Sequence, residues 1–187
     1  MKELDAINLS PLCVDLDGTL IKEDVLFVSW KALFKKTPLK GLEAFLWFFK
    51  GRAYLKKKLA NYSAIDPKTL SYNNDLLEFL KSYKSRDNNH LLILATAADY
   101  SFAKAVAEHL QIFDSIVASE GSLNLRAEFK AKRLSELFGE KNFSYVGNSF
   151  DDIKVWKNAK HAIGVNLSFK AKLFLKFENI IFYKILT

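Results

Sequence analysis

Short apolar runs that end at polar residues or glycine recur along the chain, and they restrict its fold more than any other feature. Such runs are typical of buried β-strands, and the stretches between them carry apolar residues three or four positions apart, as amphipathic helices do. Strands that alternate with helices favour a parallel sheet covered on both faces. The sequence therefore predicts an α/β protein with a three-layer, Rossmann-like parallel sheet. The predicted strands are Leu12–Val14, Leu91–Ala95, Ile116–Ala118, Tyr145–Val146 and Ala162–Val165.

The interval between the first two predicted strands is too long for one connecting helix, and it shows helical patterning without a clear strand. We interpret residues 21–72 as a helical cap inserted after the first strand. Residues 1–20 and 73–187 then form the sheet domain. Near the boundary we expect one helix that begins at Asp66-Pro67, an N-cap and first-turn pair, and another over Asn74–Lys84.

Two carboxylates follow the first predicted strand directly, in the pentapeptide Asp15-Leu16-Asp17-Gly18-Thr19. In open parallel sheets the ligand binds at the carboxyl ends of the strands. Thr96, after the second strand, and Gly147-Asn148-Ser149, after the fourth, are expected at that same edge. Asp and Gly also form ordinary turns, so the pentapeptide alone leaves a plain strand-to-turn junction open.

These pieces, together with Lys130 at the start of a predicted helix and Asp151-Asp152 behind the last loop, occur in a familiar order. From Pro11 to about Asn166 the chain resembles the haloacid dehalogenase-like superfamily of phosphohydrolases. More narrowly, it is similar to the phosphatase-like domain found fused ahead of bacterial aromatic (4-hydroxybenzoate-type) prenyltransferases, and it stops where we expect that membrane domain to begin. This narrower likeness is carried by Gly51-Arg52-Ala53, Leu94-Ala95-Thr96-Ala97, Asn124-Leu125 with Lys130, and Gly147-Asn148-Ser149.

The paired acids suit hydrolysis of a phosphate ester. A phosphomonoester is a dianion that repels a carboxylate nucleophile unless a cation such as Mg²⁺, which prefers oxygen ligands, neutralises the site. We expect Asp15 to attack phosphorus and form an aspartyl-phosphate, and Asp17 to protonate the leaving oxygen and later deprotonate water. Gly18 lets the backbone turn sharply beside the phosphate, and Thr19 steadies that turn.

Further groups are expected to assist this reaction. Thr96 would donate a hydrogen bond to a phosphoryl oxygen, and Lys130 would add a positive charge. The resemblance implies an aspartate in the place of Asn148, whose neutral amide binds Mg²⁺ more weakly than a carboxylate. The expected Mg²⁺ ligands are the Asp15 carboxylate, the Asp17 backbone carbonyl, Asn148 and Asp152.

Several of these residues have a plainer interpretation. Ser149-x-x-Asp152 matches a capping box, which would start a helix without any catalytic role. Lys130 has other basic residues nearby, and most helix lysines are merely solvated. Asn148 leaves open a second function, that of a catalytically weak binding module held at a membrane surface or partner protein. The acid Asp17 favours a phosphatase over a dehalogenase, because a halide leaving group needs no proton donor.

The positive charge of the chain is concentrated in the predicted cap. The net charge is +7, and residues 31–60 hold nine basic residues against the single acid Glu43. Helical spacing puts four apolar side chains on one face, which we interpret as the face that packs the cap. These four are Leu42, Phe45, Leu46 and Phe49.

Trp47 and Phe48 fall outside that face and are followed closely by basic residues, a combination that also suits an anionic membrane surface. Nucleic acid is a weaker candidate, because no recognised binding motif accompanies the charge. The basic residues concerned are Lys50, Arg52 and Lys56 to Lys58.

The single cysteine, Cys13, cannot form an internal disulfide and is expected to be a small buried apolar residue. The longest uniformly apolar run, Ala44–Phe49, is six residues long, whereas a transmembrane helix needs roughly 20. We therefore expect a cytoplasmic protein, with the membrane surface as an alternative location. The substrate classes left open are a phosphorylated sugar, a lipid-linked phosphate, another small phosphoester, and phosphorylated protein side chains.

Overall fold

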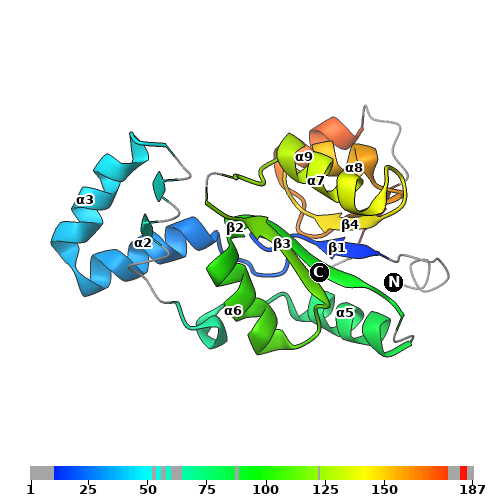
Figure 1. Cartoon of the computed structure of the whole chain (residues 1–187), viewed down its shortest axis with the longest axis horizontal. Helices are drawn as coiled ribbons and strands as arrows, with labels where there is room; N and C mark the ends of the chain where they lie inside the picture. Colours follow the sequence, from blue (N-terminus) through cyan, green and yellow to red (C-terminus); the bar gives the residue numbers. More distant parts are fainter. Residues whose placement is uncertain are drawn as a thin grey trace.

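A parallel sheet forms the centre of the protein (Figure 1). The computed structural model describes residues 11–51, 54–55, 58–59, 65–86, 89–121, 123–176 and 182–184. Six strands follow the order β3-β2-β1-β4-β5-β6, and every neighbouring pair is parallel. The predicted α/β fold with a parallel sheet is thus confirmed. The strands are β1 (Leu12–Val14), β2 (Leu92–Asp99), β3 (Ser115–Ser119), β4 (Ser144–Gly147), β5 (His161–Gly164) and β6 (Phe182–Lys184).

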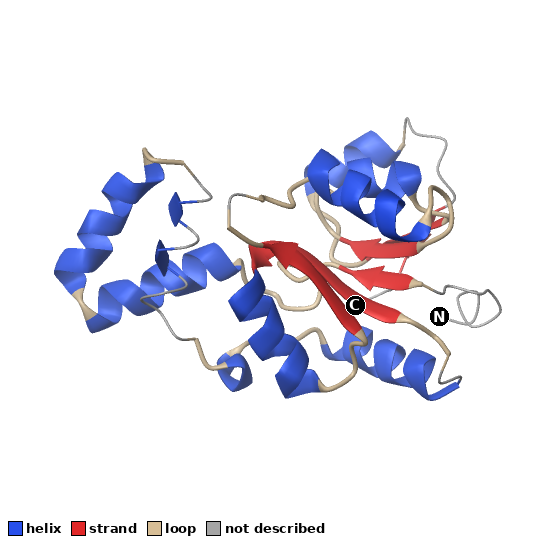
Figure 2. Cartoon of the chain, viewed as in Figure 1, coloured by secondary structure: helices blue, strands red, loops and turns tan. Residues whose placement is uncertain are grey.

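Helices cover both faces of this sheet (Figure 2). Side chains of a strand alternate between the faces, so Leu12 and Val14 enter one apolar core and Cys13 enters the other. Cys13 is fully buried, as predicted. One layer consists of α5 (Asn74–Arg86) and α6 (Tyr100–Leu110), and the other of α7 (Glu128–Phe138), α8 (Ile153–Asn158) and α9 (Phe169–Leu175).

Two further helices, α2 (Val25–Lys36) and α3 (Pro38–Phe48), stand away from these layers, on the left of Figure 1. The Asp24 carboxylate caps α2 by accepting hydrogen bonds from the backbone N–H groups of its first turn. The two helices enclose a separate apolar cluster that has its own buried side chains. That cluster consists of Leu33, Ala44, Trp47, Leu55 and Leu59.

The helix expected after Asp66 is a single 3₁₀ turn, η1 (Pro67–Thr69). Asp66 caps it as predicted, by accepting a hydrogen bond from the backbone N–H of Lys68. The turn ends at Leu70, which is extended and buried in the main core. Since the chain must return there to the sheet, a longer helix has no room to continue.

The face of α3 that we predicted to pack inward lies on the outside. Trp47 and Ala44 turn inward instead, where Trp47 is only 6 % exposed. The small residues Gly41 and Ala44 explain the reversal, because they let α2 approach closely, with Phe34 lying directly over Gly41. The apolar pattern was correct for a helix but did not reveal which face is buried. Exposed fractions of 62 to 84 % belong to Leu39, Leu42, Phe45, Leu46 and Phe49.

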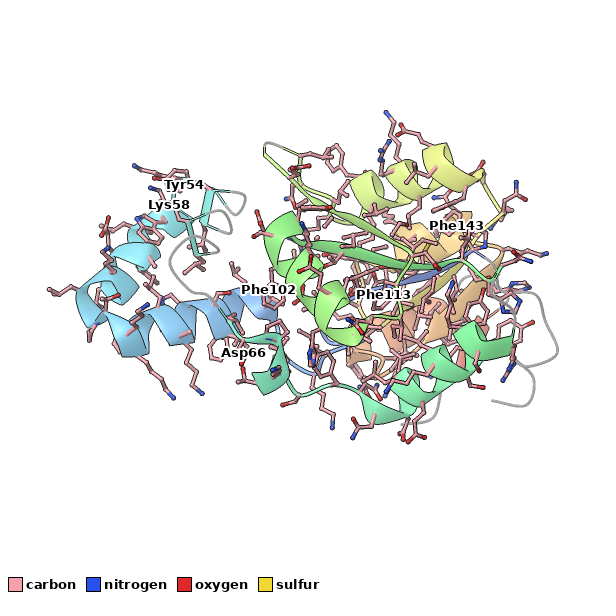
Figure 3. All side chains as sticks on the ribbon, turned by 60° about the horizontal axis from the view of Figure 1, so that its bottom comes forward. Tyr54, Lys58, Asp66, Phe102, Phe113 and Phe143 are labelled. Atoms are coloured by element: carbon pink, nitrogen blue, oxygen red, sulfur yellow. The ribbon has the colours of Figure 1, made fainter. Side chains whose placement is uncertain are left out.

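Part of the basic segment can be placed beside these helices. Lys50 and Lys58 lie with their ammonium groups 5.5 and 5.7 Å from the ring centroid of Tyr54, which Figure 3 labels together with Lys58. None of the helices in the described ranges has the length and hydropathy of a transmembrane span. Outside the described residues lie Arg52, Ala53, Lys56, Lys57 and the side chain of Phe48.

Candidate active site

Asp15 stands at the carboxyl end of β1, in the middle of the sheet. Its backbone N–H donates to the Val146 carbonyl at 2.9 Å, which continues the pairing of β1 with β4 for one more residue. The side chain is buried, and its Oδ1 lies 2.6 Å from the ammonium nitrogen of Lys130. The sheet thus brings together two predicted site residues that are 115 positions apart.

Lys130 is held by a second contact, which the sequence did not suggest. Its Nζ also donates to the hydroxyl of Tyr145 at 2.7 Å, and that hydroxyl donates in turn to Asp152 Oδ1 at 2.7 Å. Lys130 is the third residue of α7 and is almost fully buried. Its burial and its partners exclude the interpretation of Lys130 as an ordinary solvated lysine.

Burial and neighbouring charge shift the pKa values of this network. Burial, opposed by Lys130 and reinforced by Asp152 and Asp17, raises the pKa of Asp15 to about 7. Burial also works against the charged form of Lys130, but the carboxylates of Asp15 and Asp152 outweigh it and raise the pKa of Lys130. Lys130 therefore stays cationic at neutral pH, whereas Asp15 titrates there.

Asp17, two residues further on, contacts the start of α2. Its Oδ1 accepts a hydrogen bond of 2.7 Å from the backbone N–H of Val25, the first residue of α2. Gly18 N donates nearby to the Glu23 carbonyl at 3.2 Å. The predicted general acid is thus tied directly to the start of α2.

Gly18 and Asn148 meet at close range between β1 and β4. Gly18 has a φ of +70°, and a Cβ at this position would collide with the Asn148 side-chain amide. The turn after Asp17 therefore needs glycine both for its conformation and for space. Asn148 Oδ1 is buried and has no hydrogen-bond partner within the described part of the chain.

Asp152 supports the loop that carries Asn148. Its Oδ2 accepts hydrogen bonds from the backbone N–H groups of Asn148 and Ser149 at 3.0 and 2.8 Å, and from the Ser149 hydroxyl at 2.8 Å. Only half of the predicted capping box forms: Asp152 accepts from the Ser149 N–H, but the Ser149 hydroxyl donates to that carboxylate, and α8 begins after Asp152 instead of after Ser149. Both carboxylate oxygens of Asp152 are therefore occupied by the chain itself, and direct metal binding by Asp152 stays a prediction.

The two predicted threonines lie behind the site. Strand β2 runs on to Asp99, so Thr96 is inside the strand and not just after it, which corrects the expected boundary. The Thr96 side chain is fully buried, and its hydroxyl accepts a hydrogen bond of 2.9 Å from Ala98 N. Thr19 is also buried, with its Oγ1 3.5 Å from Asp15 Oδ2. Phosphate contact by either threonine stays a prediction.

A cavity of about 560 Å³ lies over Asp15 and Asp17. Its floor comes from the sheet edge and includes Lys130 and Asn148, and the opposite wall comes from α2, Leu59 and Ile65. Figure 3 labels Phe102 on α6, another lining residue, at the junction between the sheet layers and α2. The cavity is therefore shared between the sheet and the segment predicted as a cap.

Arg126 is a further lining residue that the sequence analysis did not select. It is half-exposed, and its Nε lies 2.5 Å from Asp151 Oδ2. Asn124 and Lys130 were selected from the sequence as motif residues, but the arginine between them matches no motif position and was not selected. Tyr145 escaped notice for a different reason, because within an apolar strand it looks like an ordinary core residue.

The residues at this edge fit a magnesium ion. The described residues include no cluster of three or more His, Cys, Asp or Glu side chains arranged for a metal, so an ion here would also use amide or backbone oxygens. Asn148 Oδ1, which is buried and has no hydrogen-bond partner among the described residues, could supply such an oxygen. Asp15 Oδ2, whose hydrogen bond from Thr19 is long, could supply another.

Comparison with known proteins places the fold. No protein-family model matches the sequence. The uncharacterized protein y4nM of Sinorhizobium fredii is 38 % identical over 165 residues, which cover 87 % of this chain and 31 % of that protein. The chain thus spans about a third of the length of the curated relative that it matches.

Two solved structures share the architecture. A haloacid dehalogenase-like family hydrolase, SP0104 from Streptococcus pneumoniae, superposes with a TM-score of 0.63 at 15 % identity, covering 94 % of this chain and 93 % of that one. A phospho-aspartyl intermediate analogue of phosphoserine phosphatase gives a TM-score of 0.56 at 14 % identity, with coverages of 92 and 91 %. The fold is that of the haloacid dehalogenase-like hydrolases.

Proposed function

We propose that this protein is a Mg²⁺-dependent phosphomonoesterase that works through an aspartyl-phosphate on Asp15. The observation that carries the proposal is the ion pair of the buried Asp15 with Lys130, at the floor of a cavity that also contains Asp17. The similarity to a phosphatase captured as a phospho-aspartyl analogue supports it.

In the proposed reaction a carboxylate oxygen of Asp15 forms a bond to phosphorus as the bond to the ester oxygen breaks. Asp17 gives its proton to that leaving oxygen. Water then attacks phosphorus and loses a proton to Asp17, and the bond to Asp15 breaks to release phosphate and restore the carboxylate. Lys130 holds Asp15 in place and supplies positive charge next to the phosphoryl group throughout.

Asp15, the backbone carbonyl of Asp17 and Asn148 would hold the Mg²⁺, and Asp152 would position the loop that bears Asn148. The ion would neutralise the charge of the phosphate dianion. Lys130 would stabilise the remaining negative charge of the phosphoryl group, because Asp15 and Asp152 keep its buried ammonium charged.

We also propose that residues 21–72 act as a cap that excludes water and selects the substrate. Leu26, Leu59 and Ile65 give this segment's part of the cavity an apolar surface, and Arg126 of the sheet domain also lines the cavity. This combination suits a small phosphoester with an apolar or sugar portion, such as a phosphorylated sugar or a lipid-linked phosphate. Arg126 would contact a second polar or anionic group of that substrate.

Hydrolysis of an aryl phosphate tests this function. We expect release of phosphate that depends on Mg²⁺, stops with EDTA, and falls by about 1,000-fold or more in Asp15→Asn. Asp75→Asn, which changes an exposed acid in the first turn of α5, is the matched control and should keep full activity. Equal rates in the wild-type protein and Asp15→Asn, or no turnover across a broad panel of phosphoesters, would contradict the proposal.

A further inference from the structure

We propose that α3 docks this protein on an anionic lipid bilayer through its outward apolar face. We call this surface the α3 face, and it consists of Leu39, Leu42, Phe45, Leu46 and Phe49. The inference rests on the exposure of these apolar side chains and on the lysines around them, and it holds whether or not the protein is a phosphatase.

The residues of the α3 face are exposed because other side chains already fill the interior. Ala44 and Trp47, on the opposite side of the helix, pack against Leu33 of α2 and complete the cluster there. The rings of Phe45 and Phe49 meet edge to face with their centroids 6.0 Å apart, so these two side chains form a continuous apolar surface. Monomeric proteins rarely leave a contiguous apolar surface of this kind in water unless it binds something.

Aromatic side chains of α2 lie alongside α3. Phe27 and Phe34 are both exposed, and Trp30 lies between them with ring centroids 6.2 and 5.7 Å away. Phe34 lies over Gly41 of α3, and the Trp30 indole N–H donates to the Gly41 carbonyl at 3.1 Å. These contacts fix the aromatic row of α2 alongside α3.

The charges around the α3 face select an anionic bilayer as its occupant. Between residues 25 and 51 there are five lysines and one acid, Glu43. Glu43 accepts a hydrogen bond from the Trp47 indole N–H at 3.3 Å, which holds it toward the helix. Lysine side chains beside an apolar surface can extend their ammonium groups to lipid headgroups while their aliphatic stems pack on that surface. Apolar and aromatic residues with lysines at the margin are typical of helices that lie in a membrane interface.

Docking in this way would place α3 between the bilayer and the sheet domain. In Figure 1, α3 lies at the end of the molecule away from the sheet, while the first turns of α2 line the cavity. A bilayer against α3 therefore leaves the sheet domain on the water side.

The test is co-sedimentation with vesicles of phosphatidylcholine alone and of phosphatidylcholine mixed with phosphatidylglycerol. We expect binding to the anionic vesicles only, and a decrease with salt because the charge contribution is screened. The double substitution Phe45→Gln with Leu46→Gln should lower binding at least about tenfold. Its matched control is Phe169→Gln with Leu173→Gln, an equally exposed pair on α9.

A second pair of variants tests the charge. Lys35→Gln with Lys36→Gln should weaken binding to the anionic vesicles roughly fivefold for each lysine removed. Lys104→Gln with Lys132→Gln, which changes exposed lysines of α6 and α7, should leave binding unchanged. Hydrolysis of a soluble substrate should be the same in all four doubles, so a failure of catalysis and a failure of docking are separate results.

Three outcomes overturn the proposal. The first is equal sedimentation of the α3 and α9 doubles, and the second is no sedimentation with anionic vesicles at all. The third is a concentration-dependent dimer in light scattering that Phe45→Gln with Leu46→Gln abolishes, without vesicle binding. That third result would assign the α3 face to a second copy of this chain.

Discussion

The hydroxyl of Tyr145 accepts a hydrogen bond from Lys130 Nζ at 2.7 Å, and both groups are buried in the centre of the molecule. Because the same hydroxyl donates to Asp152, it connects the cation beside Asp15 to the loop that carries Asn148. Tyr145 is therefore a positioning residue, since it acts through Lys130 and Asp152.

Tyr145→Phe should remove both hydrogen bonds and leave Asp152 Oδ1 without its buried donor. We expect a loss of about 1–3 kcal/mol in the free energy of unfolding and a fall in kcat of about tenfold, because Lys130 is less well fixed. Denaturant unfolding and steady-state kinetics measure these effects. Tyr72→Phe, which removes a local hydrogen bond of 3.0 Å to the Pro67 carbonyl, should lose stability without losing kcat. A normal kcat in Tyr145→Phe would contradict the positioning role.

Asn148 should set the affinity for Mg²⁺. Asn148→Asp adds a carboxylate where the amide oxygen has no partner, so half-maximal activity should occur at an about tenfold lower Mg²⁺ concentration. Asn148→Ala removes the ligand and should shift the midpoint the other way by a similar factor. Titration of activity and of melting temperature with Mg²⁺ gives both midpoints. If Asn148→Ala kept the wild-type midpoint, Asn148 would not be a ligand.

The pH dependence of catalysis should report on Asp15. Its pKa is raised to about 7, so the protonated, non-nucleophilic form dominates below that value, and kcat/KM should rise with pH on the acidic side of about 7. Mg²⁺ competes with the proton for the same carboxylate, so more Mg²⁺ should move the rise to lower pH. Rate profiles at two Mg²⁺ concentrations measure this shift, and profiles that coincide would argue against Asp15 as a ligand.

Gly18→Ala should disturb the site as well as the backbone. The residue has a φ of +70°, and the added methyl group would collide with Asn148, so we expect a loss of more than about 1 kcal/mol in stability and a weaker response to Mg²⁺. Gly121→Ala is the matched control, because Gly121 has a φ of +60° but open space around it. Its stability should fall by the backbone contribution alone, and its activity should not change. Equal effects of the two substitutions on the Mg²⁺ response would contradict the contact.

Local sequence patterns were enough to predict the strands. Apolar runs such as Leu12–Val14 are buried on both faces of a parallel sheet, so their hydrophobicity alone identifies them. The position of the pentapeptide from Asp15 to Thr19 could also be predicted from local sequence, because an acidic turn directly after a buried strand lies at the edge of the sheet.

Contacts between segments distant in the chain could not be predicted from the sequence patterns. Tyr145 became a site residue only because β4 lies beside β1 and turns its hydroxyl toward Lys130, a relationship that no local pattern encodes. Thr96 was expected just after its strand, but β2 pairs with β3 as far as Asp99 and so extends beyond its apolar run, which puts Thr96 within the strand.

The chain by itself determined that α3 is an amphipathic helix, because apolar spacing is a property of the helix alone. Only the tertiary structure decided which side is buried: Gly41 and Ala44 allow α2 to approach, Trp47 fills the space between, and the larger apolar stripe is left in solvent. The same holds for the charge of Lys130 and the raised pKa of Asp15. Both depend on burial and on partners that folding alone brings together.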